Sequence, residues 1–221
     1  MARKSEKEIS LNNNKDRDRF YTKMSAEQKV LFESIQNNIF TFCESVAGTG
    51  KTVVSVAAML DLLSKGDIVK IIYLQKISGR FLQHGFLPGT IEEKTDALWT
   101  PFYDAMDTLG FQPEMVDKMS EMGIILLTTD FSLRGVNFEK AGVIVEESEN
   151  CDLETLRLIF TRCHDDCHIA MIGDSRQKDN KGSKNTDFID YGKYLAKAPF
   201  GNECSLTKNY RGKFSQLAEM Y

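Results

Sequence analysis

A glycine-rich loop between residues 45 and 52 carries the clearest chemical pattern in the sequence. It reads Ser-Val-Ala-Gly-Thr-Gly-Lys-Thr and lies between an apolar run at 39–43 and a helix expected over 53–63. Glycines let backbone N–H groups turn toward a phosphate, and the helix that follows adds its N-terminal N–H groups and the positive end of its dipole. We therefore predict a nucleotide site, with ATP bound by Ala47, Gly48, Thr49, Gly50, Lys51 and Thr52.

Two side chains of this loop have the chemistry that a bound triphosphate requires. Lys51 is expected to reach the β- and γ-phosphates, and the Thr52 hydroxyl is expected to ligate Mg²⁺. Ser45 stands where such loops usually begin with glycine. We expect this serine to cost some turn geometry, because the first position shapes the entry to the loop, but to remove no phosphate donor.

A pair of carboxylates ends an apolar run at 143–145, about 95 residues after the lysine of the loop. A phosphate-loop site needs an acid there to hold Mg²⁺, usually through water, and we assign Glu146 to the metal. A second acid can act as general base toward the attacking water, and we assign that role to Glu147. Because neighbouring side chains of a strand point to opposite faces, the two carboxylates could perform separate tasks. An exposed acidic loop is the alternative interpretation.

Polar residues follow a second apolar run at the sequence Gly173-Asp174. Gln177 could sense the γ-phosphate or the attacking water, because ligands of parallel sheets bind at the carboxyl edge. Arg211 and Arg162 are the candidates for stabilising charge on the transferred phosphoryl group. Either arginine could equally be a surface ion-pair residue.

The elements that must position these residues alternate between strand and helix patterns. Apolar runs predict strands at 39–43, 69–74, 124–128, 142–145 and 168–172. Helices are expected from Ser25, over 53–63, over 91–121 with breaks at Pro101 and near Pro113, and over 152–160. Strands that are apolar along their whole length indicate a parallel sheet covered on both faces. We predict a polar flexible arm at 1–19 and one α/β domain over 20–221.

Bulk properties agree with an ordinary globular chain. Among 221 residues, 42% are hydrophobic, and the net charge of -4 argues against a protein that coats nucleic acid by charge alone. Five cysteines without regular spacing favour a reduced, cytoplasmic protein. No signal peptide is expected, and no apolar run approaches the roughly 18 residues that cross a membrane.

Several motifs in order resemble the PhoH family, a group of RecA-like ATPases related to superfamily 1 helicases. The resemblance covers residues 25–221 and is most specific in the Gly-Phe-Leu-Pro-Gly segment. The matching motifs are Ala47 to Thr52, Gly85 to Gly89, Glu93-Lys94, Arg134-Gly135, Glu146 to Asn150, Thr161-Arg162, Gly173-Asp174 with Gln177, and Asn209 to Arg211.

The resemblance implies a single RecA-like domain that uses ATP and Mg²⁺ and a role in phosphate starvation. It places Gln28 at the adenine, as in the helicase-like Q motif. Two positions depart from the family pattern Asp-Glu-Ala-Gln-Asn. Glu146 replaces the aspartate, which puts the Mg²⁺ geometry and turnover rate in question. Glu149 replaces the glutamine, which removes an amide donor and adds charge.

Two weaker constellations are present in the sequence. Cys163, His164, Cys167 and His168 are possible zinc ligands, although their spacing matches no common finger. Basic and aromatic side chains after the second strand could contact phosphates and stack on bases, with a solvated loop as the alternative. These are Lys76, Arg80, His84 and Phe86.

Three functions follow from these residues. The first is Mg²⁺-dependent ATP hydrolysis coupled to handling single-stranded RNA or DNA. Since a processive helicase uses two such domains, this chain would need a homo-oligomer, such as a ring, in which Arg211 or Arg162 reaches a neighbour's ATP. The second is a nucleotide-gated binding module with little or no hydrolysis. The third, a small-molecule phosphotransferase, lacks a visible acceptor pocket.

Overall fold

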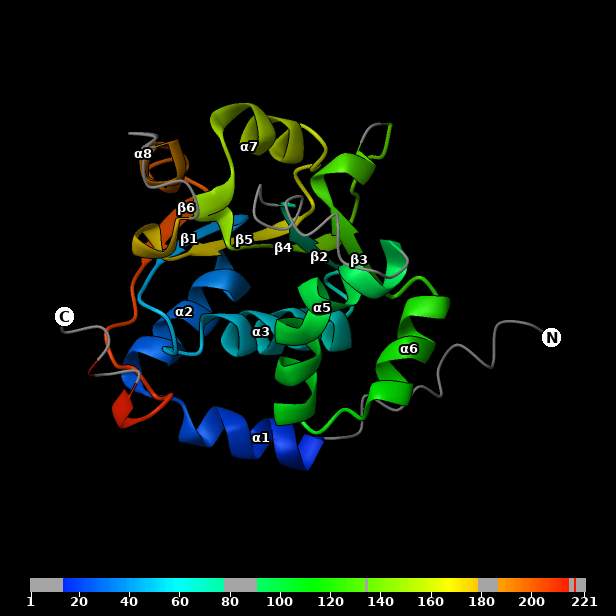
Figure 1. Ribbon diagram of the computed structural model, residues 1–221, viewed down its shortest axis with the longest axis vertical. Coiled ribbons are helices and arrows are strands. Elements are labelled where there is room, and N and C mark those ends of the chain that lie inside the picture. Colours follow the sequence, from blue (N-terminus) through cyan, green and yellow to red (C-terminus); the bar gives the residue numbers. More distant parts are fainter. Residues whose placement is uncertain (1–13, 78–90, 134, 179–186, 215–216, 218–221) are drawn as a thin grey trace.

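A six-stranded parallel sheet forms the centre of the computed structural model, which describes residues 14–77, 91–133, 135–178, 187–214 and 217 (Figure 1). The strand order is β3-β2-β4-β5-β1-β6, and each neighbouring pair is parallel. The strands are β1 Phe40–Glu44, β2 Lys70–Gln75, β3 Ile125–Thr129, β4 Ala141–Glu146, β5 His168–Gly173 and β6 Gly201–Cys204.

Helices cover both faces of the sheet, which confirms the predicted fold class (Figure 1). One face carries α2 Ala26–Asn37, α3 Lys51–Lys65, α5 Ile91–Thr108 and α6 Pro113–Glu121, with α1 Asn14–Lys23 beyond them. The other face carries α7 Leu153–Phe160 and α8 Asp187–Ala196. Three short 3-10 turns follow strand ends: η2 Asp130–Leu133, η3 Ser148–Asn150 and η4 Ser175–Gln177. No described helix could span a membrane.

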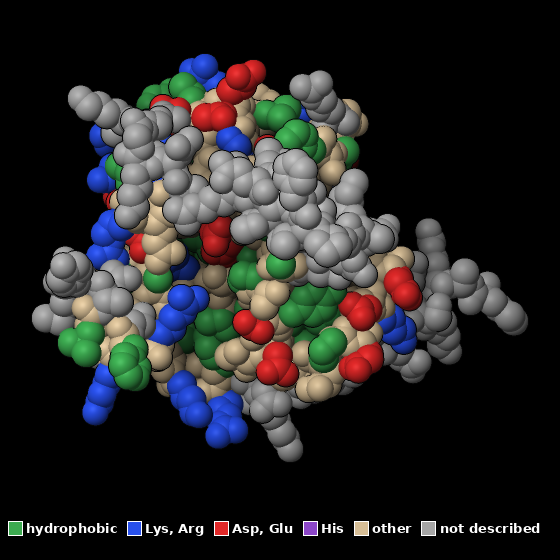
Figure 2. All heavy atoms as spheres, in the orientation of Figure 1, with side chains coloured by type: hydrophobic (Ala, Val, Ile, Leu, Met, Phe, Trp, Pro, Cys, Tyr) green, Lys and Arg blue, Asp and Glu red, His purple; other side chains and the backbone are tan. Residues whose placement is uncertain are grey.

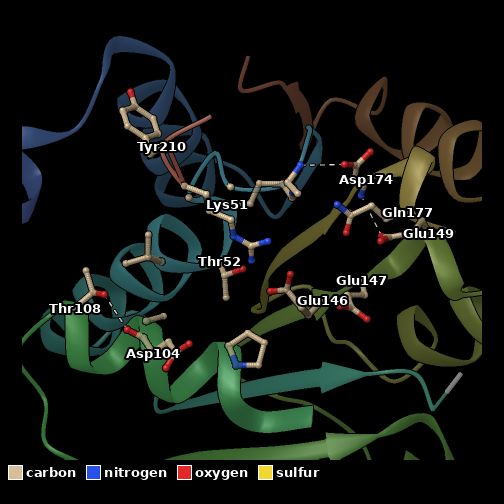
Figure 3. Close-up of a pocket in the computed structure, with 18 residues that line it drawn as sticks. Lys51, Thr52, Asp104, Thr108, Glu146, Glu147, Glu149, Asp174, Gln177 and Tyr210 are labelled. Carbon is tan, nitrogen blue, oxygen red and sulfur yellow. Dashed lines mark hydrogen bonds between the residues drawn. The ribbon is translucent and has the colours of Figure 1, made fainter. Parts of the chain in front are cut away.

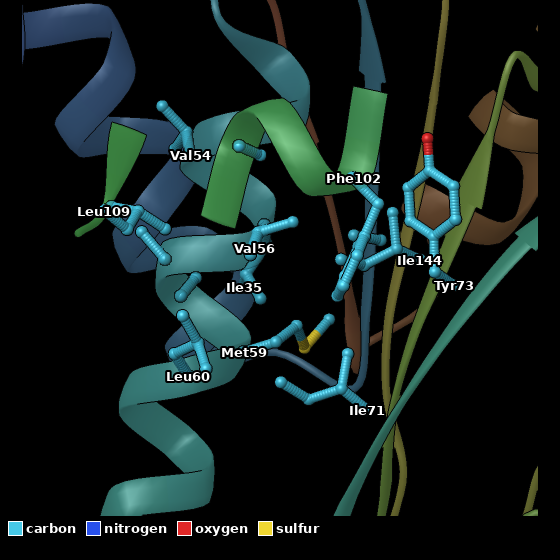
Figure 4. Packing of buried hydrophobic residues seen from close by; sticks show 14 of the residues in the cluster. Ile35, Val54, Val56, Met59, Leu60, Ile71, Tyr73, Phe102, Leu109 and Ile144 are labelled. Carbon is cyan, nitrogen blue, oxygen red and sulfur yellow. The ribbon is translucent and has the colours of Figure 1, made fainter. Parts of the chain in front are cut away.

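The larger of two apolar clusters lies between α3 and the sheet (Figure 4). Val56 and Met59 of α3 face Ile71 and Ile144 of the strands, and all four are fully buried. The Tyr73 ring packs on Phe102 of α5, with ring centroids 5.1 Å apart. This packing attaches α3, which begins directly at the phosphate loop, rigidly to the sheet.

Most predicted elements are confirmed, with boundaries shifted by one or two residues. The N-terminal cap of α2 forms as expected, because Ser25 and Gln28 bond reciprocally to each other's backbone N–H. The predicted break near Pro113 is also confirmed, because α6 begins at that proline. Strand β6 and helix α8 were not predicted; β6 is short and has little apolar character.

Two local predictions were wrong. Residues 14–19 are helical in α1 instead of belonging to an arm, and Tyr21 at the end of that helix packs against Phe32 with centroids 5.3 Å apart. Helix α5 also continues through Pro101. A proline inside a helix costs about 3 kcal/mol, but Phe102 and Met106 are fully buried on one face of α5. Their burial outweighs that cost.

Candidate nucleotide-binding site

A cavity of about 450 Å³ opens at the carboxyl edge of the sheet. Its walls come from the phosphate loop, α5, the ends of β4 and β5, and the segment after β6 (Figure 3). In the space-filling view of Figure 2, acidic and basic side chains meet around a hollow near the centre of this face. The sequence pattern placed polar residues at this edge, and five separate regions of the chain meet there.

The phosphate loop has the backbone shape that its glycines allow. Gly48 and Gly50 have φ angles of 73° and 85°, in the left-handed region that favours glycine. Helix α3 begins immediately afterwards at Lys51, whose Nζ donates to the carbonyl oxygens of Ser45 at 2.6 Å and Val46 at 3.0 Å. The ammonium group therefore lies against the inside of the loop, beside the helix N-terminus.

Ser45 does not adopt the left-handed backbone conformation that would require a glycine. Among the described residues, Lys140 and Glu147 are the non-glycine residues with positive φ. The expected cost in turn geometry stays a prediction. Its hydroxyl is buried and donates to the Glu44 carbonyl oxygen at 2.7 Å.

Gln28 supports the phosphate loop from behind. Its Nε2 donates to the Thr49 carbonyl oxygen at 2.9 Å, and its Oε1 accepts from the Ser25 N–H at 3.0 Å. Gln28 is buried and is not among the residues that line the cavity. The adenine contact that the family resemblance implies for Gln28 stays a prediction, because each end of the amide makes one bond here and keeps capacity for a second.

Glu146 ends β4 beside Thr52 and Lys51 (Figure 3). Burial raises the pKa of its carboxyl to about 7, although Lys51 and the Thr52 hydroxyl act in the opposite direction. Its Oε2 is buried and has no hydrogen-bond partner within the described part of the chain. A buried carboxylate with an unused oxygen next to a threonine hydroxyl fits Mg²⁺, which takes oxygen ligands.

Glu147 lines the same cavity as Glu146, although opposite directions were predicted. The strand ends at Glu146, and Glu147 has a φ of 45°, which turns the chain into η3 and removes the strand alternation. Its Oε2 accepts from Gln75 Nε2 at 2.9 Å. A left-handed conformation costs a non-glycine residue about 1 kcal/mol or more, so the surrounding packing holds this residue in place.

Gln177 lines the cavity from η4, as predicted for the end of β5. Two acidic site residues were absent from the predicted set. Asp174 is buried and its Oδ2 accepts from the Ala47 N–H at 2.9 Å, and Glu149 Oε2 accepts from the Asp174 N–H at 3.1 Å. Burial raises the pKa of Glu149 to about 8. The position of Asp174 directly after an apolar strand was a signal that could have identified it.

The two candidate arginines lie in different places. Arg211 lines the cavity together with Tyr210. Arg162 follows α7, and its carbonyl oxygen accepts from the Phe138 N–H at 2.7 Å, near the edge where β4 and β5 begin. It therefore does not belong to this cavity.

Helix α5 contributes Pro101, Asp104, Ala105 and Thr108, which no local pattern could have assigned to the site.

The weaker constellations gain little support. Lys76 Nζ is paired with Asp152 Oδ2 at 2.7 Å. Its companions Arg80, His84 and Phe86 lie outside the described residues, as do the Gly-Phe-Leu-Pro-Gly segment and Arg134. His168 Nδ1 lies 2.9 Å from the Ile35 carbonyl oxygen, and the described residues contain no cluster of three or more metal-ligating side chains.

This fold and loop define a phosphate-loop protein of the RecA-like class, and comparison with known proteins identifies its family. The model of the PhoH-like protein family matches residues 21–209, and the chain belongs to that family. A PhoH-like protein of Mycobacterium leprae is 30% identical over 155 residues, or 70% of this chain and 44% of the relative. One from Bacillus subtilis is 31% identical over 153 residues, or 69% and 47%.

The chain spans less than half the length of these relatives. Protein PhoH of Escherichia coli is 29% identical over 148 residues, which is 66% of this chain and 42% of that protein. Among solved structures, the helicase MrfA bound to DNA and AMPPNP matches with a TM-score of 0.54 at 10% identity. That match covers 90% of this chain and 29% of MrfA, and it shows the shared fold.

Proposed function

We propose that this chain binds ATP with Mg²⁺ and hydrolyses the terminal phosphate. The observation that carries the proposal is the buried Glu146 carboxylate with an unpartnered Oε2, beside Lys51 and Thr52. Burial disfavours the charged form of this carboxylate, and a cation bound at Oε2 would stabilise it beyond what Lys51 provides. Membership of the PhoH-like family supports the same conclusion.

The predicted residues that line the cavity each have a role in this proposal. The loop N–H groups and Lys51 hold the β- and γ-phosphates, while Thr52 and Glu146 would hold Mg²⁺. When bound, the ion would neutralise charge on the phosphate oxygens. Glu147 accepts a proton from the attacking water, since its carboxylate is exposed and held by Gln75. Gln177 orients that water, and Arg211 stabilises charge on the transferred group.

Charge in the cavity favours a metal-dependent mode of binding. Five carboxylates line it, against two cationic side chains, Lys51 and Arg211. A bare triphosphate would be repelled by this excess of acids, whereas Mg²⁺ would lower the charge of the nucleotide, and Glu146 would help to hold the ion. The half-exposed ring of Tyr210 at the cavity wall offers a surface for the base.

Coupling to single-stranded RNA or DNA is the further part of the proposal. The fold is shared with MrfA, whose structure was solved with DNA and AMPPNP. Because that match covers 29% of MrfA, further domains or further copies of this chain would complete a motor. In a homo-oligomer, such as a ring, Arg211 could act at the boundary between two subunits. Arg162 lies at the opposite edge of the sheet, so it could reach only the nucleotide site of a neighbouring subunit.

The test is phosphate release from Mg-ATP, with and without single-stranded RNA and DNA. The wild type is compared with Lys51→Ala and Glu147→Gln, and with exposed Glu154→Gln as a matched control. We expect turnover by the wild type and the control and its loss in the other two variants, while stimulation by one polymer identifies the partner. A wild type that binds ATP but turns over no faster than Glu147→Gln contradicts hydrolysis.

That second outcome would favour the nucleotide-gated module. One feature supports it as the alternative: Glu146 stands where the family pattern has aspartate, and its side chain is one methylene longer. The longer side chain alters the geometry available to Mg²⁺, which demands near-ideal octahedral coordination. Binding of ATP would then still order the cavity walls, and the module would act on a partner through that ordering.

A further inference from the structure

The segment at residues 206–211, which we call the clamp segment, crosses directly against the phosphate loop. The Leu206 N–H donates to Ser45 Oγ at 2.6 Å, and the Tyr210 N–H donates to the Gly48 carbonyl oxygen at 2.8 Å. Two separate backbone N–H groups of the clamp segment are therefore bonded to the loop that we expect to hold the phosphates.

The clamp segment and the phosphate loop pack so closely that the backbone conformation of one restricts that of the other. A Cβ atom placed on Gly48 would lie 2.7 Å from Asn209 Oδ1 and 2.9 Å from Arg211 Cγ. Asn209 is buried, and its Oδ1 accepts from the Arg211 N–H at 2.8 Å. The position of Arg211 in the cavity thus depends on how the clamp segment lies on Gly48.

Ser45 provides a contact that a glycine at the start of the loop cannot make. Its hydroxyl donates to the Glu44 carbonyl oxygen and accepts from the buried Leu206 N–H. A glycine would leave that N–H without its acceptor, which costs about 1–3 kcal/mol for a buried group. The departure from the usual loop pattern therefore has a structural consequence at the clamp segment.

Glu27 holds the clamp segment from the other side. Its carboxylate accepts from the Thr207 N–H at 2.8 Å and from Thr207 Oγ1 at 2.7 Å. The next residue of α2, Gln28, holds the loop at the Thr49 carbonyl oxygen. The first turn of α2 thus contacts both the clamp segment and the phosphate loop, and it fixes one relative to the other.

We propose that Ser45 and Glu27 are positioning residues that hold the clamp segment on the phosphate loop and thereby direct Arg211 toward the terminal phosphate of the bound nucleotide. The proposal rests on the proposed function, because Arg211 matters only if a nucleotide binds in this cavity. Neither residue touches the reacting atoms, and both act through the backbone of the clamp segment.

Steady-state ATPase kinetics test the link to Arg211. We expect Ser45→Ala, Ser45→Gly and Glu27→Gln each to lower kcat by roughly five- to tenfold with little change in KM. In a double-mutant cycle, Ser45→Ala should cost almost nothing in an Arg211→Ala background. Exposed Ser64→Ala and Glu33→Gln are matched controls that should behave as wild type.

Ser45→Gly gives the sharpest result, because two ideas predict opposite signs. If the serine only disturbs a glycine position, restoring glycine raises kcat; if it holds the clamp segment, restoring glycine lowers kcat. An increase, or additive effects of Ser45→Ala and Arg211→Ala, overturns the proposal.

Limited trypsin digestion provides a readout that needs no hydrolysis. The clamp segment and the residues directly after it contain exposed cleavage sites after Lys208, Arg211 and Lys213. We expect Mg²⁺ with a non-hydrolysable ATP analogue to slow cleavage there severalfold in the wild type, and much less in Ser45→Ala and Glu27→Gln. Equal protection in all three overturns the proposal even if turnover is normal. Protection in a wild type without turnover supports the clamp while contradicting hydrolysis.

Discussion

Glu147 illustrates how single residues of this site depend on their neighbours. Its left-handed backbone removes it from the strand pattern and brings it to the cavity that Glu146 also lines. Gln75, at the end of the adjacent strand and opposite Glu146 in register, donates to its carboxylate. An exposed carboxylate has many rotamers, so this bond selects the orientation that general-base catalysis would need.

Gln75→Ala should therefore slow turnover without weakening nucleotide binding. We expect kcat to fall roughly fivefold to tenfold, because one orienting hydrogen bond is lost while the phosphate contacts stay intact. Phosphate release and binding of a fluorescent ATP analogue measure the two effects. Exposed Gln112→Ala is the control, and a loss of affinity equal to the loss of rate would show that Gln75 acts on binding instead.

Glu149 makes stability depend on pH. Burial raises its pKa from 4.5 to about 8, so the folded state holds a proton that the unfolded state releases. Its favourable contribution is fully present below about pH 4.5 and is lost as the pH rises through 8. Without nucleotide or metal, Glu149→Gln should raise the unfolding free energy at pH 8.5 by up to about 4–5 kcal/mol relative to wild type.

Urea unfolding at pH 5 and pH 8.5 measures this difference. The advantage of Glu149→Gln should shrink at pH 5, where the wild-type carboxyl is neutral as well. Exposed Glu154→Gln should follow the wild type at both pH values. An equal effect of Glu149→Gln at the two pH values would point to altered packing instead of a buried proton.

At the scale of elements, helix α8 packs closely against strand β1, because a glycine of the helix leaves no side chain between them. Gly192 of α8 lies over the Phe42 ring of β1, and an added Cβ would come within 2.5 Å of the ring carbons. Phe42 cannot withdraw easily, because it is fully buried and packs edge-on against Phe188 at 5.1 Å. This contact holds α8 against β1, the strand that leads into the phosphate loop.

Gly192→Ala should destabilise the protein, against the usual rule for helices. Alanine normally stabilises a helix by about 1 kcal/mol relative to glycine, but overpacking against a fixed ring costs roughly 1–3 kcal/mol. We expect a net loss in unfolding free energy, measured by chemical denaturation. Exposed Lys193→Ala in the same helix should change it by less than about 0.5 kcal/mol. A more stable Gly192→Ala would show that the helix can move outward.

At the scale of the whole molecule, the cavity is formed by elements far apart in sequence. The phosphate loop, α5, η3, η4 and the clamp segment each contribute to its wall. A ligand that contacts all of these binds the folded state and not the unfolded chain, so binding and global stability are linked. The acidic excess of the lining makes that link depend on metal.

Mg-ATP should raise the thermal unfolding midpoint, whereas ATP with a chelator should not. At a ligand concentration near 100 times Kd, the gain is about 2.7 kcal/mol, which corresponds to roughly 5–10 °C for a chain of this size. Differential scanning fluorimetry measures the shift. Lys51→Ala should abolish it, and an equal shift with ATP alone would contradict the role assigned to Glu146 and the metal.

Local sequence patterns determined the phosphate loop, the first five strands along the chain and the acids at the end of β4. Each depends on a few consecutive residues: glycines permit positive φ, apolar runs require burial, and carboxylates after a parallel strand reach one edge. Family membership followed from the same motifs. Arg162 does not line the cavity, because a residue's type does not reveal to which edge of the sheet the fold brings it.

Tertiary structure alone decided which residues from distant parts of the sequence meet at the cavity. Asp104 of α5, Tyr210 of the clamp segment and Glu149 reach it because α3 and α5 pack on one face of the sheet and the chain after β6 returns across the loop. The orientation of Glu147 and the contact between Ser45 and Leu206 also depend on residues distant in sequence. Such contacts are set by packing of whole elements, which local propensity and periodicity do not encode.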